Sequence, residues 1–292
     1  MYIITLCNIC AMEKSYWHIC TDGLAREIIF KDVKDYIFGM NGVPALSLSY
    51  DITVLAFCLM SNHVHFVVHG VEKGCRAFIT AYKKRLSLIA DVGMADICVK
   101  QIDTDDYLLR VIGYVLRNPV GAGLGVMPQF YRWSSASLYF NKDRVVDGIT
   151  VEDVGTKRMR GILRSHYRLP SDYIVTTDGM VDPSCYVDYR AVESLFGHVG
   201  RMLYFLSRND DMEMELTENH LSKSSYSDEE LAVSVRVICR EKFGCDSPDG
   251  LSVESRYSLA SILRKRYGLG PRQLARLTGT DPQLLRGILL KK

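Results

Sequence analysis

The chain of 292 residues contains no apolar run as long as the roughly 18 residues that a membrane-spanning helix needs. We therefore expect a soluble protein. The opening segment, MYIITLCNICAMEK, lacks the basic region and the small-residue cleavage site of a secretory signal, so export is not expected. Internal repeats and low-complexity tracts are also missing from the sequence.

A disulfide framework is not indicated either. The nine cysteines are odd in number and lie mostly in apolar segments, which fits reduced thiols in a cytoplasm. Cys7 and Cys10 have CxxC spacing, but no second CxxC or histidine pair follows at the distance of a zinc site. We assign this pair no role and expect a cytoplasmic protein.

The chain has little net charge, +2, because 36 Lys or Arg residues are nearly balanced by 34 Asp or Glu residues. Its distribution is more informative. Residues 251–292 carry nine Lys or Arg against two acids, a net charge of +7, which leaves −5 for residues 1–250. The sequence therefore predicts a basic C-terminal module attached to a mildly acidic body.

Strand and helix patterns alternate in the first half, with no glycine-rich phosphate loop after any strand. This favours an α+β fold, with helices on one face of an antiparallel sheet, followed by an all-α C-terminal region. Strands are expected over residues 15–22, 52–57 and 60–69, the last two forming one long strand or two bulged segments. Helices are expected over residues 32–40, closed by Gly42 and Pro44, over 78–89, and over 103–117, ending before Asn118-Pro119.

After residue 139 the periodicity weakens. The patterns divide the chain into residues 1–140, an extension and linker of unassigned role over 141–227, and a helical region over 228–292. Further helices are expected over residues 193–207, 254–267, 272–278 and 282–290, with a polar linker over 209–227.

Two histidines interrupt the apolar segment FCLMSNHVHFVVHG, residues 57–70. Alternate residues of a strand face the same way, roughly 6.5–7 Å apart, so His63 and His65 project together. We interpret the pair as ligands of a divalent cation, and two half-buried histidines bonded to backbone carbonyls are the alternative. A histidine-triad hydrolase is excluded because the third alternate position is Val67. An oxygen-preferring ion such as Mg²⁺ or Mn²⁺ would take further oxygen ligands from protein, substrate and water.

A second polar face lies on the helix in VIGYVLRNPVGAGL, residues 111–124. Tyr114 and Asn118 are four residues apart and share one helix face, bordered by Arg110 and Arg117. A phenol, an amide and two guanidiniums on one surface suit a phosphodiester substrate. The alternative is an ordinary helix end with one tyrosine reaching solvent.

Together these segments resemble the REP-associated tyrosine transposases, within the single-tyrosine HUH (His-hydrophobe-His) transposases. The matching pieces, in the family's order and spacing, are CLMSNHVHFVV (58–68), YLLRVIGYVLRNPVGAGL (107–124) and YRWSS (131–135). The segment WHICTDGLAREIIFKDVKDY (17–36) is similar to a divergent form of the family's opening strand and helix. The resemblance covers roughly residues 15–140.

The resemblance implies a ferredoxin-like core that cuts and joins single-stranded or hairpin DNA. It implies Tyr114 as the nucleophile, which forms a 5′-phosphotyrosine link and frees a 3′-hydroxyl. His63, His65 and Asn118 would bind the catalytic Mg²⁺ or Mn²⁺. The chain would then be a DNA transposase or a domesticated relative, associated with the bacterial nucleoid, and a homodimer is compatible with this. Two alternatives stay open: a metal phosphoesterase that uses water, and a non-catalytic DNA-binding regulator derived from a transposase.

The DNA contacts depart from the family pattern. Family members usually carry a basic, aromatic loop before the tyrosine helix, where this chain keeps only Lys100. Besides Arg110 and Arg117, we expect DNA contacts from Lys83, Lys84 and Arg85, which could equally be a solvated helix face.

The basic tail, residues 267–292, looks like a helix-turn-helix with its turn at Gly279. Arg272, Gln283 and Arg286 are its expected DNA contacts. A small helical module for protein interaction is the alternative.

Overall fold

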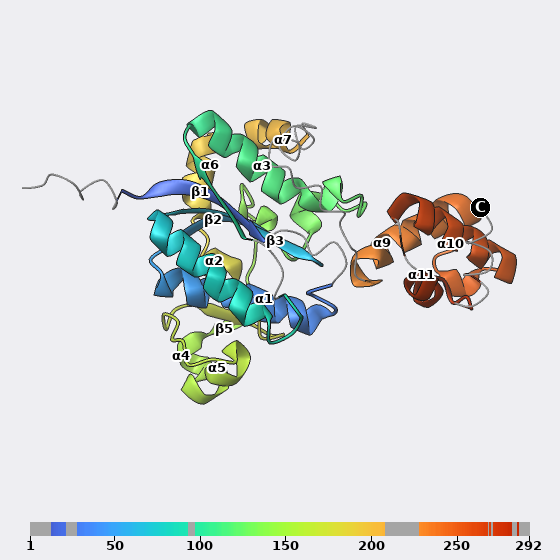
Figure 1. Cartoon of the computed structure of the whole chain (residues 1–292), viewed down its shortest axis with the longest axis horizontal. Helices are drawn as coiled ribbons and strands as arrows, with labels where there is room; N and C mark the ends of the chain where they lie inside the picture. The colour runs from blue at the N-terminus through green and yellow to red at the C-terminus, as the bar shows by residue number, and fades with distance from the viewer. Residues whose placement is uncertain are drawn as a thin grey trace, which may run out of the picture.

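The computed structural model of the chain describes residues 13–21, 28–92, 97–207, 228–267, 269, 271–281 and 285. A four-stranded sheet lies at its centre (Figure 1). The strands are antiparallel in the order β2-β3-β1-β4, with bounds β1 Ser15–Thr21, β2 Thr53–Met60, β3 His63–Gly70 and β4 Ile97–Ile102. Helices α1 (Val33–Ser49) and α2 (Glu72–Leu86) complete a β-α-β-β-α-β unit, the ferredoxin-like order. The expected α+β class is confirmed.

Helices cover both faces of this sheet. Successive residues of β3 face opposite sides of the sheet, and Phe66 packs its ring against Phe78 and Tyr82 of α2, at 5.3 and 5.1 Å between centroids. On the other side, His65 packs against Tyr114 of α3 (Asp105–Gly121), at 5.5 Å. Helices α1 and α2 therefore lie on one face, as expected, and α3 covers the opposite face (Figure 1).

Two helices continue through prolines that the sequence pattern placed at their ends. Helix α1 includes Pro44 and runs to Ser49, and α3 includes Pro119 and runs to Gly121. Both prolines are buried, so packing around them offsets the roughly 3 kcal/mol that an interior proline costs an isolated helix. The expected ends at Gly42 and before Asn118 were therefore wrong, and Asn118 belongs to α3.

The connection between β2 and β3 is a two-residue turn, Ser61-Asn62. The two segments are thus a hairpin, and Cys58 and Leu59 continue β2 rather than dividing it. The irregularity in this pair lies between Val54 and Ala56. This register sets His63 at the start of β3, directly after the turn.

The extension packs into the same core as the sheet, because one cluster of buried side chains runs from Trp17 to Met202. The side chain of Asn41 in α1 anchors the extension. Its Nδ2 donates to Gly179 O at 2.9 Å, and its Oδ1 accepts from Val181 N at 2.7 Å. Gly197, with φ of 74°, divides the single helix expected over 193–207 into two. The extension comprises β5 (Gly148–Thr150), α4 (Val151–Val154), α5 (Thr156–Leu163), β6 (Ile174–Thr176), α6 (Tyr189–Phe196) and α7 (Val199–Ser207).

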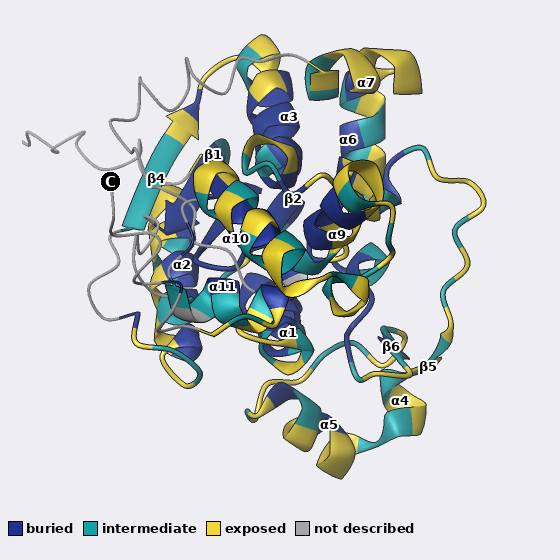
Figure 2. Cartoon of the chain, turned by 90° about the vertical axis from the view of Figure 1, so that its right-hand side faces the viewer, coloured by how far each residue is buried: buried dark blue, intermediate teal, exposed yellow. Residues whose placement is uncertain are grey.

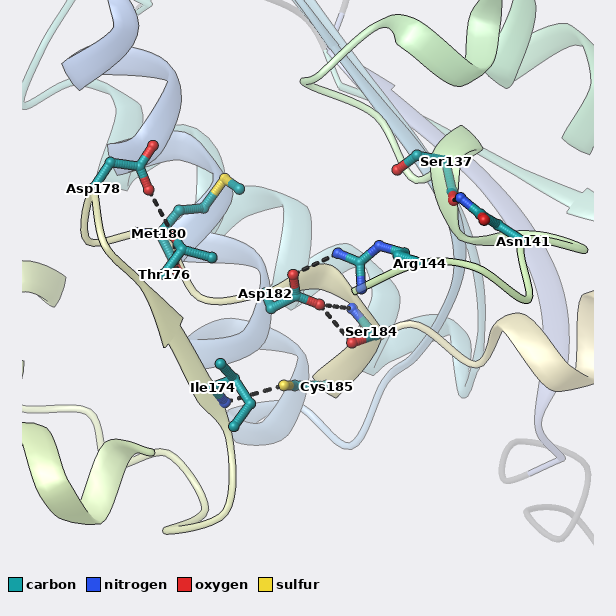
Figure 3. Close-up of polar contacts among 10 residues, drawn as sticks. All are labelled: Ser137, Asn141, Arg144, Ile174, Thr176, Asp178, Met180, Asp182, Ser184 and Cys185. Atoms are coloured by element: carbon teal, nitrogen blue, oxygen red, sulfur yellow. Dashed lines mark hydrogen bonds and ion pairs between the residues drawn. The ribbon is translucent and has the colours of Figure 1, made fainter. Parts of the chain in front are cut away.

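An ion pair between the half-buried Arg144 and the buried Asp182 orders the loop after β6. Figure 3 shows Arg144 paired with Asp182, whose other oxygen caps the turn at Ser184. Cys185 Sγ accepts a hydrogen bond from Ile174 N at 3.2 Å. These contacts order the loop around Asp182, in a segment whose sequence has only weak periodicity.

The C-terminal helices form a second, smaller core, visible as a separate cluster in Figure 1 and facing the viewer in Figure 2. They are α9 (Asp228–Ile238), α10 (Val253–Tyr267) and α11 (Pro271–Thr278), with a π-helical turn at Cys239–Phe243. Leu285 is buried against them, whereas the rest of the helix expected over 282–290, and the linker expected over 209–227, lie outside the described residues. Short 3₁₀ turns occupy Pro128–Phe130, Ala136–Leu138, Pro183–Cys185 and Pro248–Gly250.

Among the helices that the structure describes, none has the length and apolar character to span a membrane. The seven cysteines within the described residues are all free thiols.

Candidate active site

One face of the central sheet carries a cluster of imidazoles under α3. His63 and His65 alternate with Val64 and Phe66, so both rings lie on the α3 side of β3. Their centroids are 4.9 Å apart, and both side chains are buried. The structure thus brings the two histidines together as their spacing predicts.

The hairpin turn fixes the ring of His63. Ser61 O accepts hydrogen bonds from the backbone N–H groups of Ile29 and Phe30, at 2.7 and 3.0 Å, which anchors the turn. Asn62 Oδ1 then lies 2.8 Å from His63 Nδ1. An amide oxygen only accepts, so Nδ1 donates this hydrogen bond, and Nε2 is the ring nitrogen that points away from the turn.

Helix α3 lays Tyr114 and Asn118 over these rings. Its start is capped by Thr104, whose side chain accepts from Tyr107 N. The Tyr114 ring stands edge-on to His65 and His18, at 5.5 and 5.9 Å between centroids. Asn118 Oδ1 lies 3.1 Å from His63 Nε2. The phenol and the amide, predicted to share a helix face, both meet the imidazole cluster.

The contact between His63 and Asn118 has the character of a cation site. Asn118 Nδ2 donates to Tyr114 O at 3.2 Å, which turns the amide oxygen toward His63. His63 Nε2 and Asn118 Oδ1, both of which can bind a cation, are thus brought within 3.1 Å of each other. Two ligands about 2.1 Å from an octahedral ion, at right angles, lie about 3.0 Å apart. The residues present therefore fit an ion such as Mg²⁺ or Mn²⁺.

His65 is suited to complete this set. Burial, chiefly, and then its neighbours His63 and His18 hold the pKa of His65 well below the usual 6.5, against a hydrogen bond to Asn118 that raises it. The ring is therefore neutral near pH 7 and keeps a lone pair for a metal.

The arginines of α3 differ in their surroundings. Arg110 is exposed, and its nearest acid is Asp106, at 3.9 Å between the charged atoms. Arg117 is buried, with 5 % of its surface exposed. Arg110 is thus open to a substrate from solvent, whereas Arg117 is largely shielded from it.

The basic group on α2 lies across the sheet from Tyr114. Lys84 is exposed and Lys83 half-buried. Arg85 is buried, donates to Leu163 O at 2.7 Å, and stacks 4.0 Å from the centroid of the Phe38 ring. Burial also lowers the pKa of Arg85. This arginine connects α1, α2 and the end of α5, a placement that serves packing rather than DNA contact.

Replacing Arg85 with methionine is expected to lower the free energy of unfolding by about 1–3 kcal/mol, because Leu163 O loses a buried donor. Lys84→Gln, on the same helix, should change stability by less than about 0.5 kcal/mol. Chemical denaturation measures both. Weakened DNA binding by Arg85→Met at unchanged stability would instead make Arg85 a DNA contact.

The expected DNA contacts of the tail are only partly described. The backbone of Arg272 belongs to α11, but its side chain, like Gln283 and Arg286, lies outside the described residues. The turn at Gly279 does have the positive φ, 64°, of a helix end. Of the other basic residues here, Lys265 and Arg266 are exposed, and Arg276 pairs with Asp228.

Sequence reasoning missed two residues of the cluster, His18 and Cys20 of β1. Together with His65 they form a buried group whose possible ligand atoms all lie within 4.8 Å of one another. The segment WHIC does carry a signal, since His18 and Cys20 are alternate residues of a strand. Recognising it required the pairing of β1 with β3, in which Cys20 lies opposite His65.

Comparison with known proteins gives one distant likeness. No protein-family model and no curated protein matches the chain. A solved structure described as a REP-associated tyrosine transposase bound to a REP hairpin is similar over 42 % of this chain and 78 % of that chain. The sequence identity is 13 % and the TM-score 0.34.

Proposed function

We propose that this chain cuts and rejoins single-stranded or hairpin DNA, with Tyr114 as the nucleophile and a divalent cation held by His63, His65 and Asn118. One observation supports the proposal most strongly: Tyr114 lies edge-on to the imidazole of His65, and the neighbouring His63 Nε2 and Asn118 Oδ1 lie within 3.1 Å of each other. The sequence resemblance to the HUH transposases points to the same residues.

The protein side chains supply position and orientation. The turn at Asn62 orients His63, and the carbonyl of Tyr114 orients Asn118. Tyr114 is 9 % exposed, so its phenol meets the substrate at the edge of a buried cluster. A bound cation would draw charge from the scissile phosphate and offset charge in the transition state.

The reaction conserves the number of phosphate esters. The Tyr114 phenol gives up its proton, its oxygen bonds to phosphorus, and the bond from phosphorus to the 3′-oxygen breaks. That oxygen leaves and takes up a proton, so the strand ends in a 3′-hydroxyl and the 5′-phosphate is esterified to tyrosine. Attack by another 3′-hydroxyl reverses the step and joins strands without ATP.

Contacts with DNA are proposed for two surfaces. Arg110 lies exposed on the helix that carries Tyr114. The C-terminal unit offers the strongest basic charge, +7 over residues 251–292, with Lys265 and Arg266 exposed. Both would bind phosphates in a salt-dependent manner.

A direct experiment uses end-labelled palindromic single strands incubated with the protein and Mg²⁺. The proposal expects a labelled species that survives denaturant and disappears when EDTA is present. Cleaved strands without such a species would instead favour a phosphoesterase that uses water. Binding without cleavage would favour a regulator.

Asn118→Ala is expected to weaken metal binding by roughly 10-fold or more, because the ion loses an oxygen ligand and His63 loses its facing partner. The concentration of Mn²⁺ that gives half-maximal cleavage should rise accordingly. Asn141→Ala, which removes a surface amide bonded to Ser137 O, is the matched control and should leave it unchanged. Equal metal requirements for the two variants would remove Asn118 from the ligand set.

A further inference from the structure

A third imidazole packs against the proposed metal ligands. His18 of β1 is fully buried, and its ring stacks on that of His65 with centroids 5.4 Å apart and planes at 15°. The two rings also meet through nitrogen atoms, since His18 Nε2 lies 3.2 Å from His65 Nδ1.

This contact determines which nitrogen of His65 can bind an ion. A neutral imidazole has one N–H and one lone pair, and a metal takes the lone pair. His65 Nδ1 faces His18, so Nε2 is the nitrogen that His65 can offer to an ion shared with the neighbouring His63. An ion held by His63, His65 and Asn118 would take the lone pair of His65 Nε2, and Nδ1 would then carry the hydrogen and donate it to His18 Nε2.

We propose that His18 is a positioning residue, which accepts the Nδ1–H of His65 and holds that ring with Nε2 toward the ion. The inference rests on the metal site proposed above and names a residue outside its ligand set. A partner that accepts the second N–H of a ligating histidine fixes both its tautomer and its orientation.

The surroundings of His18 fit this role. Its neighbours across the sheet are Val67 of β3 and Lys100 of β4, so strands on both sides fix its backbone. Its ring also contacts Tyr114 edge-on, at 5.9 Å between centroids. One buried side chain thus touches both a proposed ligand and the proposed nucleophile.

Direct ligation by His18, Cys20 and His65 is the competing arrangement, because their possible ligand atoms are close together. It would employ His65 Nδ1 as the ligand and include a thiolate, which suits zinc more than magnesium. It would also leave His63 Nε2 and Asn118 Oδ1, which lie 3.1 Å apart, outside the metal site. A positioning role for His18 accounts both for its contact with His65 and for the contact between His63 and Asn118.

The test measures Mn²⁺ binding to the full chain without DNA, by electron paramagnetic resonance. His18→Leu should bind Mn²⁺ roughly 10- to 100-fold more weakly than the wild type. His18→Gln keeps an acceptor of similar reach and should stay within about threefold of it. Pulsed measurements should count two coordinated imidazoles in the wild type and in His18→Leu.

Cys20→Ala is the matched control on the same strand and should bind Mn²⁺ like the wild type. Thermal unfolding of each variant shows whether a loss of Mn²⁺ affinity comes from a loss of folded protein. If His18→Leu does not fold, the Mn²⁺ affinity of His18→Gln is the measurement that tests the inference. Three results would overturn the role of His18 but leave the proposed metal site standing. They are three coordinated imidazoles in the wild type, a loss of Mn²⁺ affinity in Cys20→Ala, and unchanged Mn²⁺ affinity in His18→Leu. A wild type that binds no Mn²⁺ would overturn the proposed metal site with it.

Discussion

Replacing Tyr114 with phenylalanine is expected to reduce the rate of DNA cleavage by roughly 10⁴-fold or more, because the variant has no oxygen to attack phosphorus. The covalent protein–DNA species should disappear altogether. The phenyl ring can keep its edge-on contacts with His65 and His18. Folding, DNA affinity and Mn²⁺ affinity should therefore stay close to those of the wild type.

Tyr107→Phe is the matched control, since Tyr107 lies on the same helix and contacts Lys100 rather than the imidazoles. It should cleave at the rate of the wild type. Single-turnover assays on a labelled strand measure both variants. A covalent species formed by Tyr114→Phe would reject the assignment of the nucleophile.

Replacing Glu230 with alanine is expected to lower the free energy of unfolding by about 3 kcal/mol. This carboxylate reaches from α9 into the first core and is 7 % exposed. Its Oε1 lies 2.9 Å from the hydroxyls of Tyr36 and Tyr131 and 3.1 Å from Ser61 N. Truncation leaves these three buried donors without that acceptor.

Glu230→Ala should also weaken the proposed metal site. Ser61 begins the turn that orients His63, so its amide should lose protection from hydrogen exchange in Glu230→Ala, and Mn²⁺ affinity should fall. Glu241→Ala, a change of an exposed glutamate in the same unit, should alter neither. Denaturation and exchange identical to the wild type would show that Glu230 does not join the two units.

Local spacing predicted much of the candidate site. The alternation of His63 and His65 on a strand, and the four-residue step from Tyr114 to Asn118 on a helix, are properties of single elements. Both faces exist in the structure, and the sequence resemblance supplied the expectation that they meet. The end of α3 was predicted too early in the chain. The sequence pattern includes the energetic cost of Pro119 in a helix but not the packing that offsets it.

Long-range partners could not be predicted in this way. His18 meets His65 across 47 residues, and Glu230 meets Ser61 across 169. Neither contact follows from a period within one element, since each depends on strand pairing or on how the C-terminal unit docks. Arg85 shows the same limit: its basic neighbours suggested a DNA contact, whereas tertiary packing buries it.

The central claim is that the phenol of Tyr114 attacks DNA beside a cation held by His63, His65 and Asn118. Peptide mapping by mass spectrometry tests it most directly, after incubation with a palindromic single strand and Mg²⁺. The account predicts a peptide containing Tyr114 that carries the 5′-phosphorylated fragment, formed only when the metal is present. An adduct on another residue, or cleaved strands with free 5′-phosphates and no adduct, would contradict it.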